Sequence, residues 1–191
     1  MKVIAFNSSP HKDGNTAQAL KVVCEQLEQH GVTTELVHLY PMGLRGCCAC
    51  MKCKEAQDRC CHGPQDGING LIEKMLEADG MLLGSPVYFS GMNPELKALI
   101  DRAGMVTRAN GHLLKRKLGA AVVALRRQGA LPTFDGINHF FLVSQMIVPG
   151  SSYWNMVLGG APGEMRNDEE GLDTLRTLGE NMAWLLKRLQ D

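Results

Sequence analysis

Residues 3–16 read Val-Ile-Ala-Phe-Asn-Ser-Ser-Pro-His-Lys-Asp-Gly-Asn-Thr, and this stretch decides the fold. Its four apolar residues predict a buried strand, the small polar residues of 7–16 break that strand, and helical periodicity follows. Such a turn can present backbone N–H groups and hydroxyls to one anion, and the start of the helix adds a partial positive charge. We therefore predict that residues 7–16 hold a phosphate group. An ordinary strand-to-helix turn is the alternative, and the rest of the chain has to decide between them.

The composition limits the class of protein. The 191 residues are enough for one α/β domain with a substantial core. Lys plus Arg equals Asp plus Glu, at 20 each, so no net field favours nucleic acid or an anionic membrane as a partner. Met1 and Lys2 run directly into the first strand, which predicts no signal peptide, and no apolar stretch reaches the ~18 residues of a membrane span. We expect a cytoplasmic protein.

Strand and helix patterns alternate along the chain. Asn15 is expected to cap the first helix, and Asn93 and Pro94 to start the third. Residues 41–67 have no period and form an insertion or long functional loop after the second strand. The alternation predicts a parallel sheet with helices on both faces, in a single domain over residues 1–191. The expected strands are 3–6, 32–39, 80–85, 118–125 and 153–158, and the expected helices are 16–30, 133–147 and those that begin at 68, 94 and 168.

Three loops of unusual composition follow predicted strands, at the sheet edge where ligands bind in open α/β proteins. The first, 7–16, lacks both G-x-G-x-x-G and G-K-[ST], which disfavours tightly bound NAD and NTP hydrolysis and favours a monophosphate. In the second, 85–92, Tyr88 and Phe89 offer flat apolar surface to an aromatic heterocycle, although strand-end core residues would look the same. The third, 126–129, supplies guanidinium groups for an anionic ring or a second phosphate. Together the loops predict a site for flavin mononucleotide (FMN).

Two motifs carry a family resemblance over essentially the whole chain. Ser8-Ser9-Pro10-x-x-x-Gly14-Asn15-Thr16, followed by Ser85-Pro86-Val87-Tyr88-Phe89, resembles the flavodoxin-like NADPH-dependent FMN reductase family. The resemblance implies a flavodoxin-like three-layer sandwich with a five-stranded parallel sheet of order 2-1-3-4-5. It also implies which residues bind FMN. The expected phosphate-binding residues are Ser8, Ser9, Pro10, His11, Lys12, Gly14, Asn15 and Thr16, those along the ribityl chain and ring are Pro86, Val87, Tyr88 and Phe89, and those bordering the ring are Arg126, Arg127 and Gly129.

Six of the seven cysteines lie within residues 47–61. Structural disulfides are disfavoured in a reducing compartment, so metal binding or redox chemistry is the better interpretation. Cys24 instead lies on the predicted core face of the first helix and is expected to be an inert buried thiol.

The spacing Cys47-x-x-Cys50-x-x-Cys53, followed by Cys60, allows the thiolates to turn inward around one small object. It resembles the iron–sulfur flavoprotein branch of the same family and predicts a [4Fe–4S] cluster bound by Cys47, Cys50, Cys53 and Cys60. A structural Zn²⁺ with His62 as a substitute ligand, or free thiols, are the alternatives. Cys47 and Cys60 each belong to a doublet, with Cys48 and Cys61. The ligand could therefore be either cysteine of each doublet.

The sequence thus predicts an FMN-dependent oxidoreductase with an iron–sulfur cluster as a second redox centre, and no side chain is assigned as a catalytic acid or base. The electron donor or acceptor would be NAD(P)H, a small molecule or a ferredoxin-type protein. Three alternatives are an NAD(P)H-dependent quinone or flavin reductase without a cluster, a pure electron carrier, and a zinc-stabilised module without flavin. The resemblance further implies a homodimer or homotetramer.

Overall fold

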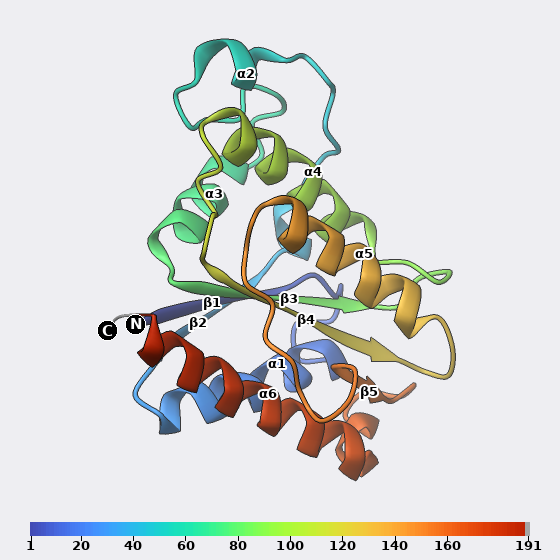
Figure 1. The fold of residues 1–191 in the computed structure, drawn as a ribbon. Coiled ribbons are helices and arrows are strands. Elements are labelled where there is room, and N and C mark those ends of the chain that lie inside the picture. The colour runs from blue at the N-terminus through green and yellow to red at the C-terminus, as the bar shows by residue number, and fades with distance from the viewer. Residues whose placement is uncertain (190–191) are drawn as a thin grey trace.

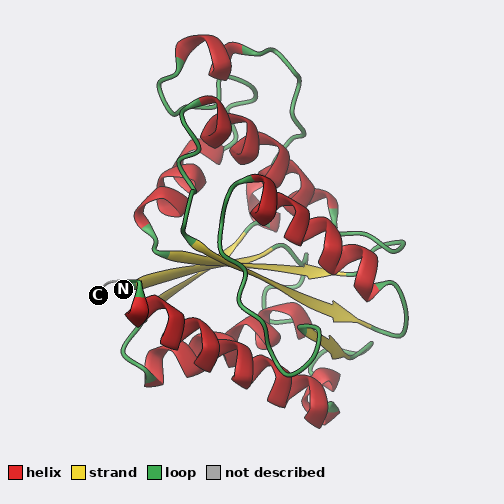
Figure 2. Cartoon of the chain, viewed as in Figure 1, coloured by secondary structure: helices red, strands yellow, loops and turns green. Residues whose placement is uncertain are grey.

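A computed structural model describes residues 1–189 and has three layers, with a central sheet between two layers of helices (Figures 1 and 2). The strands are β1 (Lys2–Asn7), β2 (Thr33–His38), β3 (Gly80–Pro86), β4 (Leu118–Leu125) and β5 (Met156–Leu158). The α-helices are α1 (Asn15–Gln29), α2 (Lys52–Ala56), α3 (Ile68–Glu77), α4 (Pro94–Ala109), α5 (Ala130–Val143) and α6 (Glu169–Arg188), and the 3-10 turns are η1 (Tyr40–Met42) and η2 (Glu164–Asn167). Among residues 1–189, no helix is both long and apolar enough to cross a bilayer.

The sheet has the order β2-β1-β3-β4-β5, and all four pairings are parallel. The predicted order is therefore confirmed, with β2 at an edge. All strands end on the same side of the sheet, as Figure 1 shows for β3 and β4. This arrangement brings the loops that follow β1, β3, β4 and β5 to one edge.

Both faces of the sheet are covered by apolar side chains because successive residues of a strand point in opposite directions. In β1, Ile4 and Phe6 belong to the core beneath α3, α4 and α5, whereas Val3 and Ala5 belong to the core against α1 and α6. Figure 1 shows the same division of the helices between the two faces. Cys24 lies in the second core, as predicted, and burial raises the pKa of its thiol to about 11.

The fifth strand is shorter than predicted, with β5 covering Met156–Leu158 and not 153–158. The Met156 N–H donates to the Trp154 carbonyl at 2.8 Å, and this tight local turn prevents the preceding residues from extending the strand. Tyr153 and Trp154 are instead about half exposed and contact each other edge to face, with ring centroids 4.4 Å apart.

The fifth helix is also shifted, because α5 begins at Ala130 and ends at Val143, whereas the prediction was 133–147. Gly129, with φ of 89°, turns the chain into the helix earlier than expected. Gln145, with φ of 58°, turns it away, and Ile147 then pairs with the start of β4 in a short parallel bridge.

The insertion lies outside the layered body, above α3 and α4 (Figure 1). It contains the short helix α2, which the sequence pattern did not predict because five residues are too few to show a period. Helix α2 packs against α4. Through α2, the insertion is therefore supported by α4 of the main body.

We expect Gly119→Ala to destabilise the fold by about 1–3 kcal/mol through overpacking. A Cβ at Gly119 would lie 2.5 Å from Cδ1 of Phe141, a buried ring that fixes α5 on β4. Gly70→Ala is the matched control, because a Cβ there meets no atom within 4 Å and the helix interior favours Ala by about 0.5–1 kcal/mol. Urea unfolding of both variants measures the difference, and equal stabilities would contradict the packing argument.

Candidate functional site

The first loop is closed by its own buried hydrogen bonds. Ser9 donates its N–H to Asn7 Oδ1 at 3.1 Å, and Ser9 Oγ accepts the His11 N–H at 3.2 Å. Ser8 is fully buried and its hydroxyl donates to the Gly84 carbonyl, so this side chain joins the loop to β3. Ser8 and Ser9 therefore shape the loop, while the exposed His11 and Lys12 lie at its outer surface.

The start of α1 faces this loop. The N-cap is Gly14, and Asn15 is the first helical residue, which corrects the prediction that Asn15 caps the helix. By helix geometry the N–H groups of Asn15, Thr16 and Ala17 have no partner inside the helix. These three donors, with the positive end of the helix dipole, form the part of the first loop that can hold a phosphate.

Asn15 has a different task, which the sequence did not indicate. Its Nδ2 donates to the carbonyls of Gly159 and Ala161 at 3.0 and 2.9 Å, and its Oδ1 accepts the Gly163 N–H at 2.8 Å. The side chain thus fixes the loop after β5 beside the first loop. The Gly-Gly-Ala-Pro-Gly sequence of 159–163 was the signal for this fourth loop, and our sequence analysis missed it.

The second loop is a tight turn with an exposed aromatic tip. Tyr88 and Gly91 exchange backbone hydrogen bonds of 2.9 and 3.1 Å, and between them Phe89 and Ser90 have φ of 47° and 61°. Left-handed conformations at two residues other than Gly cost about 1–3 kcal/mol each and cluster at ligand-binding sites. Phe89 is fully exposed and Tyr88 is about half exposed, so neither is a core residue and both offer ring surface at the strand ends.

The third loop contacts the second. A Cβ at Gly129 would lie 2.9 Å from both Val87 Cγ1 and Ser90 Oγ, so only Gly fits at this position. Arg126 and Arg127 are exposed. Arg126 instead contacts the loop after β5, at Gly160. The third loop and the loop after β5 line an open cavity of about 720 Å³ together with the start of α6.

Asn93 is the buried residue that joins the first and second loops. Its Oδ1 accepts from the hydroxyls of Ser8 and Ser85, and its Nδ2 donates to the Ser8 carbonyl. The sequence assigned it only to the start of α4, where it is the N-cap but makes no side-chain cap bond. Its side chain instead holds the two loops at a fixed separation.

The cysteines of the insertion form a second centre. A small pocket between the insertion and α4 is lined by Arg102 and Met105 among others, and its thiols are those of Cys47, Cys48, Cys50, Cys53 and Cys61. Cys60, the predicted fourth ligand, does not line this pocket. No group of three or more His, Cys, Asp or Glu side chains within residues 1–189 is preformed as a site for a metal ion.

The thiols differ in their electrostatic surroundings. Burial raises the pKa of Cys53, and the neighbouring thiols of Cys61, Cys50 and Cys47 raise it further. A backbone N–H at Lys52 lowers the pKa of the exposed Cys50. The pocket lining likewise places Cys53 with thiols from both ends of the insertion.

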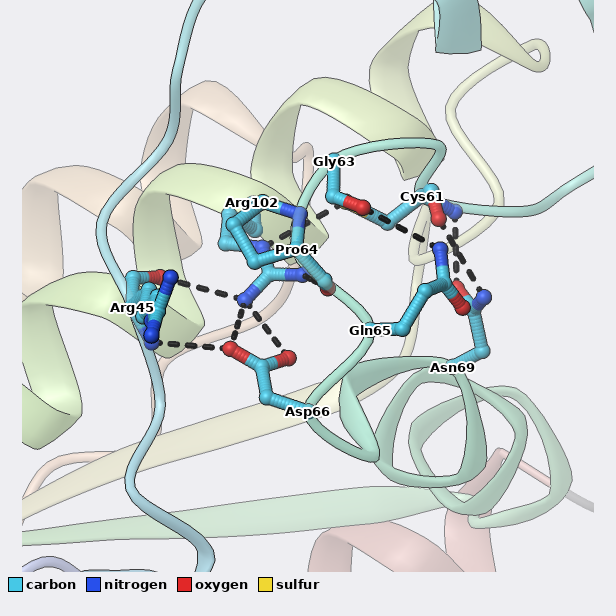
Figure 3. A network of polar contacts seen from close by, with 8 residues as sticks. All are labelled: Arg45, Cys61, Gly63, Pro64, Gln65, Asp66, Asn69 and Arg102. Carbon is cyan, nitrogen blue, oxygen red and sulfur yellow. Dashed lines mark hydrogen bonds and ion pairs between the residues drawn. The ribbon is translucent and has the colours of Figure 1, made fainter.

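A buried arginine supports the cysteine pocket (Figure 3). The Arg102 Nε–H donates to Cys61 Sγ at 3.4 Å, and Nη1 donates to both carboxylate oxygens of Asp66 at 2.8 and 2.6 Å. Nη1 also lies 3.1 Å from the Arg45 carbonyl, and Nη2 donates to the Pro64 carbonyl. Burial opposes ionisation of Asp66, but bonds from Arg102 and from the Arg45 N–H hold its pKa below the usual range.

Comparison with known proteins identifies the family. Residues 1–160 match the family model for NADPH-dependent FMN reductase. Iron–sulfur flavoproteins of Methanocaldococcus jannaschii and Methanosarcina thermophila are 37% and 31% identical over 100% of this chain, and the alignments cover 100% and 97% of those proteins. The crystal structure of RosB with bound 8-demethyl-8-formylriboflavin-5'-phosphate is similar, with a TM-score of 0.78 at 17% identity over 100% of this chain and 80% of that one.

The fold and the four strand-end loops define a flavodoxin-like FMN-dependent oxidoreductase. Within that class, the chain belongs to the NADPH-dependent FMN reductase family, in its iron–sulfur flavoprotein branch. The resemblance found in the two sequence motifs is thus confirmed.

We expect Asn93→Ala to weaken FMN binding and lower stability. The change removes the Asn93 donor from the buried Ser8 carbonyl, and an unpaired buried acceptor costs about 1–3 kcal/mol. If that energy is lost from the loop geometry that binds FMN, the dissociation constant rises roughly tenfold. Fluorescence titration of the apoprotein with FMN measures this dissociation constant. The control is Asn181→Ala on α6, which removes one exposed hydrogen bond, and an unchanged affinity in both variants would contradict the prediction.

We expect Asp66→Ala to destabilise the protein by about 3–5 kcal/mol, because it leaves the buried Arg102 charge unpaired. Asp101→Ala removes an exposed ion pair with Lys97 and should cost less than about 1 kcal/mol. Urea unfolding compares the free energies of unfolding of the two variants. Since the pKa of Asp66 is depressed in the folded state, its contribution is complete above the ordinary Asp value of about 3.9 and is lost as the pH falls through the depressed value. Equal losses in the two variants at pH 7 would argue against the buried pair.

Proposed function

We propose that this FMN-dependent oxidoreductase carries a [4Fe–4S] cluster as a second redox centre, held by Cys47, Cys50, Cys53 and a fourth thiol from the doublet of Cys60 and Cys61. The observation that carries the proposal is the single pocket lined by thiols from both ends of the insertion. Thiolates are the usual ligands of iron–sulfur clusters, and no carboxylate is among the described residues that line the pocket. A single metal ion needs ligands that converge on one point, whereas a cluster of several iron and sulfur atoms needs ligands spaced around it. The thiols surround a pocket and do not converge on one point, which agrees with a cluster.

We assign the FMN site to the strand-end loops. The free N–H groups at the start of α1 would bind the phosphate, with Ser9, Pro10, His11, Lys12 and Gly14 around them. Pro86 to Phe89 would lie along the ribityl chain and ring, and the guanidinium of Arg126 or Arg127 would face the ring from the opposite loop. Ser8 acts by fixing the first loop to β3. When bound, FMN supplies hydride and one-electron chemistry and the cluster supplies one-electron chemistry, so no side chain is required as an acid or base.

Helix α4 connects the two centres. Its N-cap Asn93 joins the FMN loops, and Arg102 lies under the cysteine pocket eight residues beyond the first helical residue, Pro94, which is about 12 Å along the helix. Cys47 and Cys50 are exposed, so a cluster bound there would be accessible to a protein partner at the surface. This geometry supports electron exchange between a ferredoxin-type protein and FMN. We further assign NAD(P)H or another small molecule as the second electron donor or acceptor, within a cytoplasmic homodimer or homotetramer.

Anaerobically purified protein tests the proposal. We expect FMN, iron and acid-labile sulfide to be retained together, with a visible spectrum in which cluster absorption adds to that of the flavin and decreases on reduction. The cluster is expected to be reducible by a protein donor such as reduced ferredoxin.

Flavin without iron or sulfide, after anaerobic purification and reconstitution with iron and sulfide, would overturn the cluster assignment. In that case steady-state oxidation of NAD(P)H by a quinone would identify a simple reductase, and bound zinc would identify the structural alternative. The flavin assignment itself fails if the apoprotein stays colourless after addition of FMN.

A further inference from the structure

We propose that Arg102 is a positioning residue of the cysteine site, which makes Cys61, and not Cys60, the fourth thiolate. The inference rests on the proposed [4Fe–4S] function and names residues of this chain that act toward that cluster. The sequence alone left the choice within the doublet open.

Cys61 is held from two helices of the main body. Its N–H donates to Asn69 Oδ1 at 2.7 Å, and its carbonyl accepts from Asn69 Nδ2 at 3.2 Å, which fixes its backbone to α3. Its thiol accepts the Arg102 Nε–H from α4 and is buried in the pocket. Figure 3 shows these contacts on Cys61. The sulfur is therefore oriented before any cluster binds.

Cys60 has no comparable support. Its recorded backbone contact is a hydrogen bond from its N–H to Asp58 Oδ1 at 3.0 Å, within the same exposed turn. Among the residues that line the pocket, Cys61 is present and Cys60 is absent. The thiol that the main body holds in place is therefore also the one that faces the other cysteines.

The guanidinium also closes the base of the insertion. Arg102 donates to the Arg45 carbonyl before the cysteines and to the Pro64 carbonyl and Asp66 after them. Five donors in a rigid planar fork suit such a set of acceptors, and the compact ammonium of Lys could satisfy only part of it. Arg102 is 1% exposed, so all of these contacts are shielded from water.

The same contacts predict an effect on the cluster's reduction potential. Hydrogen bonds to cluster sulfurs and local charge are two of the factors that set this potential. Loss of Arg102 removes an N–H···S bond and leaves the negative charge of Asp66 uncompensated. Both changes disfavour an additional electron, so the potential should become more negative.

The cysteine doublet provides a matched pair of variants. In anaerobically purified Cys61→Ser, we expect loss of the wild-type iron and sulfide content, whereas Cys60→Ser retains it. Bound FMN serves as the folding control in both. Loss of iron in C60S, or its retention in C61S, would overturn the assignment. Wild-type protein that holds no iron would instead overturn the proposed function.

The role of Arg102 is tested with Arg102→Gln and Arg102→Lys, with Arg108→Gln, an exposed charge on the same helix, as the control. We expect both Arg102 variants to retain FMN and to show lower iron content or a more negative cluster potential in EPR-monitored titration, while R108Q matches the wild type. Loss of FMN in R102Q would indicate that this variant does not fold. The positioning role is then tested with R102K alone, because Lys keeps the positive charge. Wild-type iron content and potential in R102K or R102Q would overturn the positioning role.

Discussion

All five strands run in one direction, and the meeting of the strand-end loops, where we propose the FMN site, depends on this constraint. Parallel pairing requires every connection to return through a helix, so each strand-to-helix loop ends at the same edge of the sheet. Loops separated by 85 to 148 residues in the chain therefore meet there. Asn15 contacts the loop at 159–163 and Asn93 contacts Ser8 for this reason.

Helix α4 organises both centres. At its start, the Asn93 side chain joins two FMN loops, and in its middle, Arg102 joins the two ends of the insertion. Each does so by satisfying buried polar groups, which are expensive to leave without partners. A displacement of α4 would therefore affect the flavin site and the cysteine site together. The helix therefore connects the strand-end loops and the insertion physically.

The two centres are built in different ways. The proposed flavin site consists of backbone donors and tight turns, including left-handed residues at Phe89 and Ser90 and the close contact of Gly129 with Val87. The cysteine site is an insertion held by the packing of α2 on α4, by one buried ion pair and by hydrogen bonds. The first is suited to a cofactor bound by shape and hydrogen bonds. The second is suited to a centre whose covalent ligands help to fix the chain.

The sequence by itself determined the fold class, the strand-end loops and the cysteine spacing. Strand and helix periods, Gly and Pro at turns, and ligand spacing are local properties, so they can be recognised in a single chain. The tertiary structure decided the contacts between residues that are far apart in the chain, which local sequence patterns do not contain. It assigned Asn15 to a distant loop, shortened β5, and buried Cys61 beside Arg102. Each depends on groups brought together from remote parts of the chain. The cysteine spacing fits either Cys60 or Cys61, and only the tertiary structure shows that Cys61 lines the pocket.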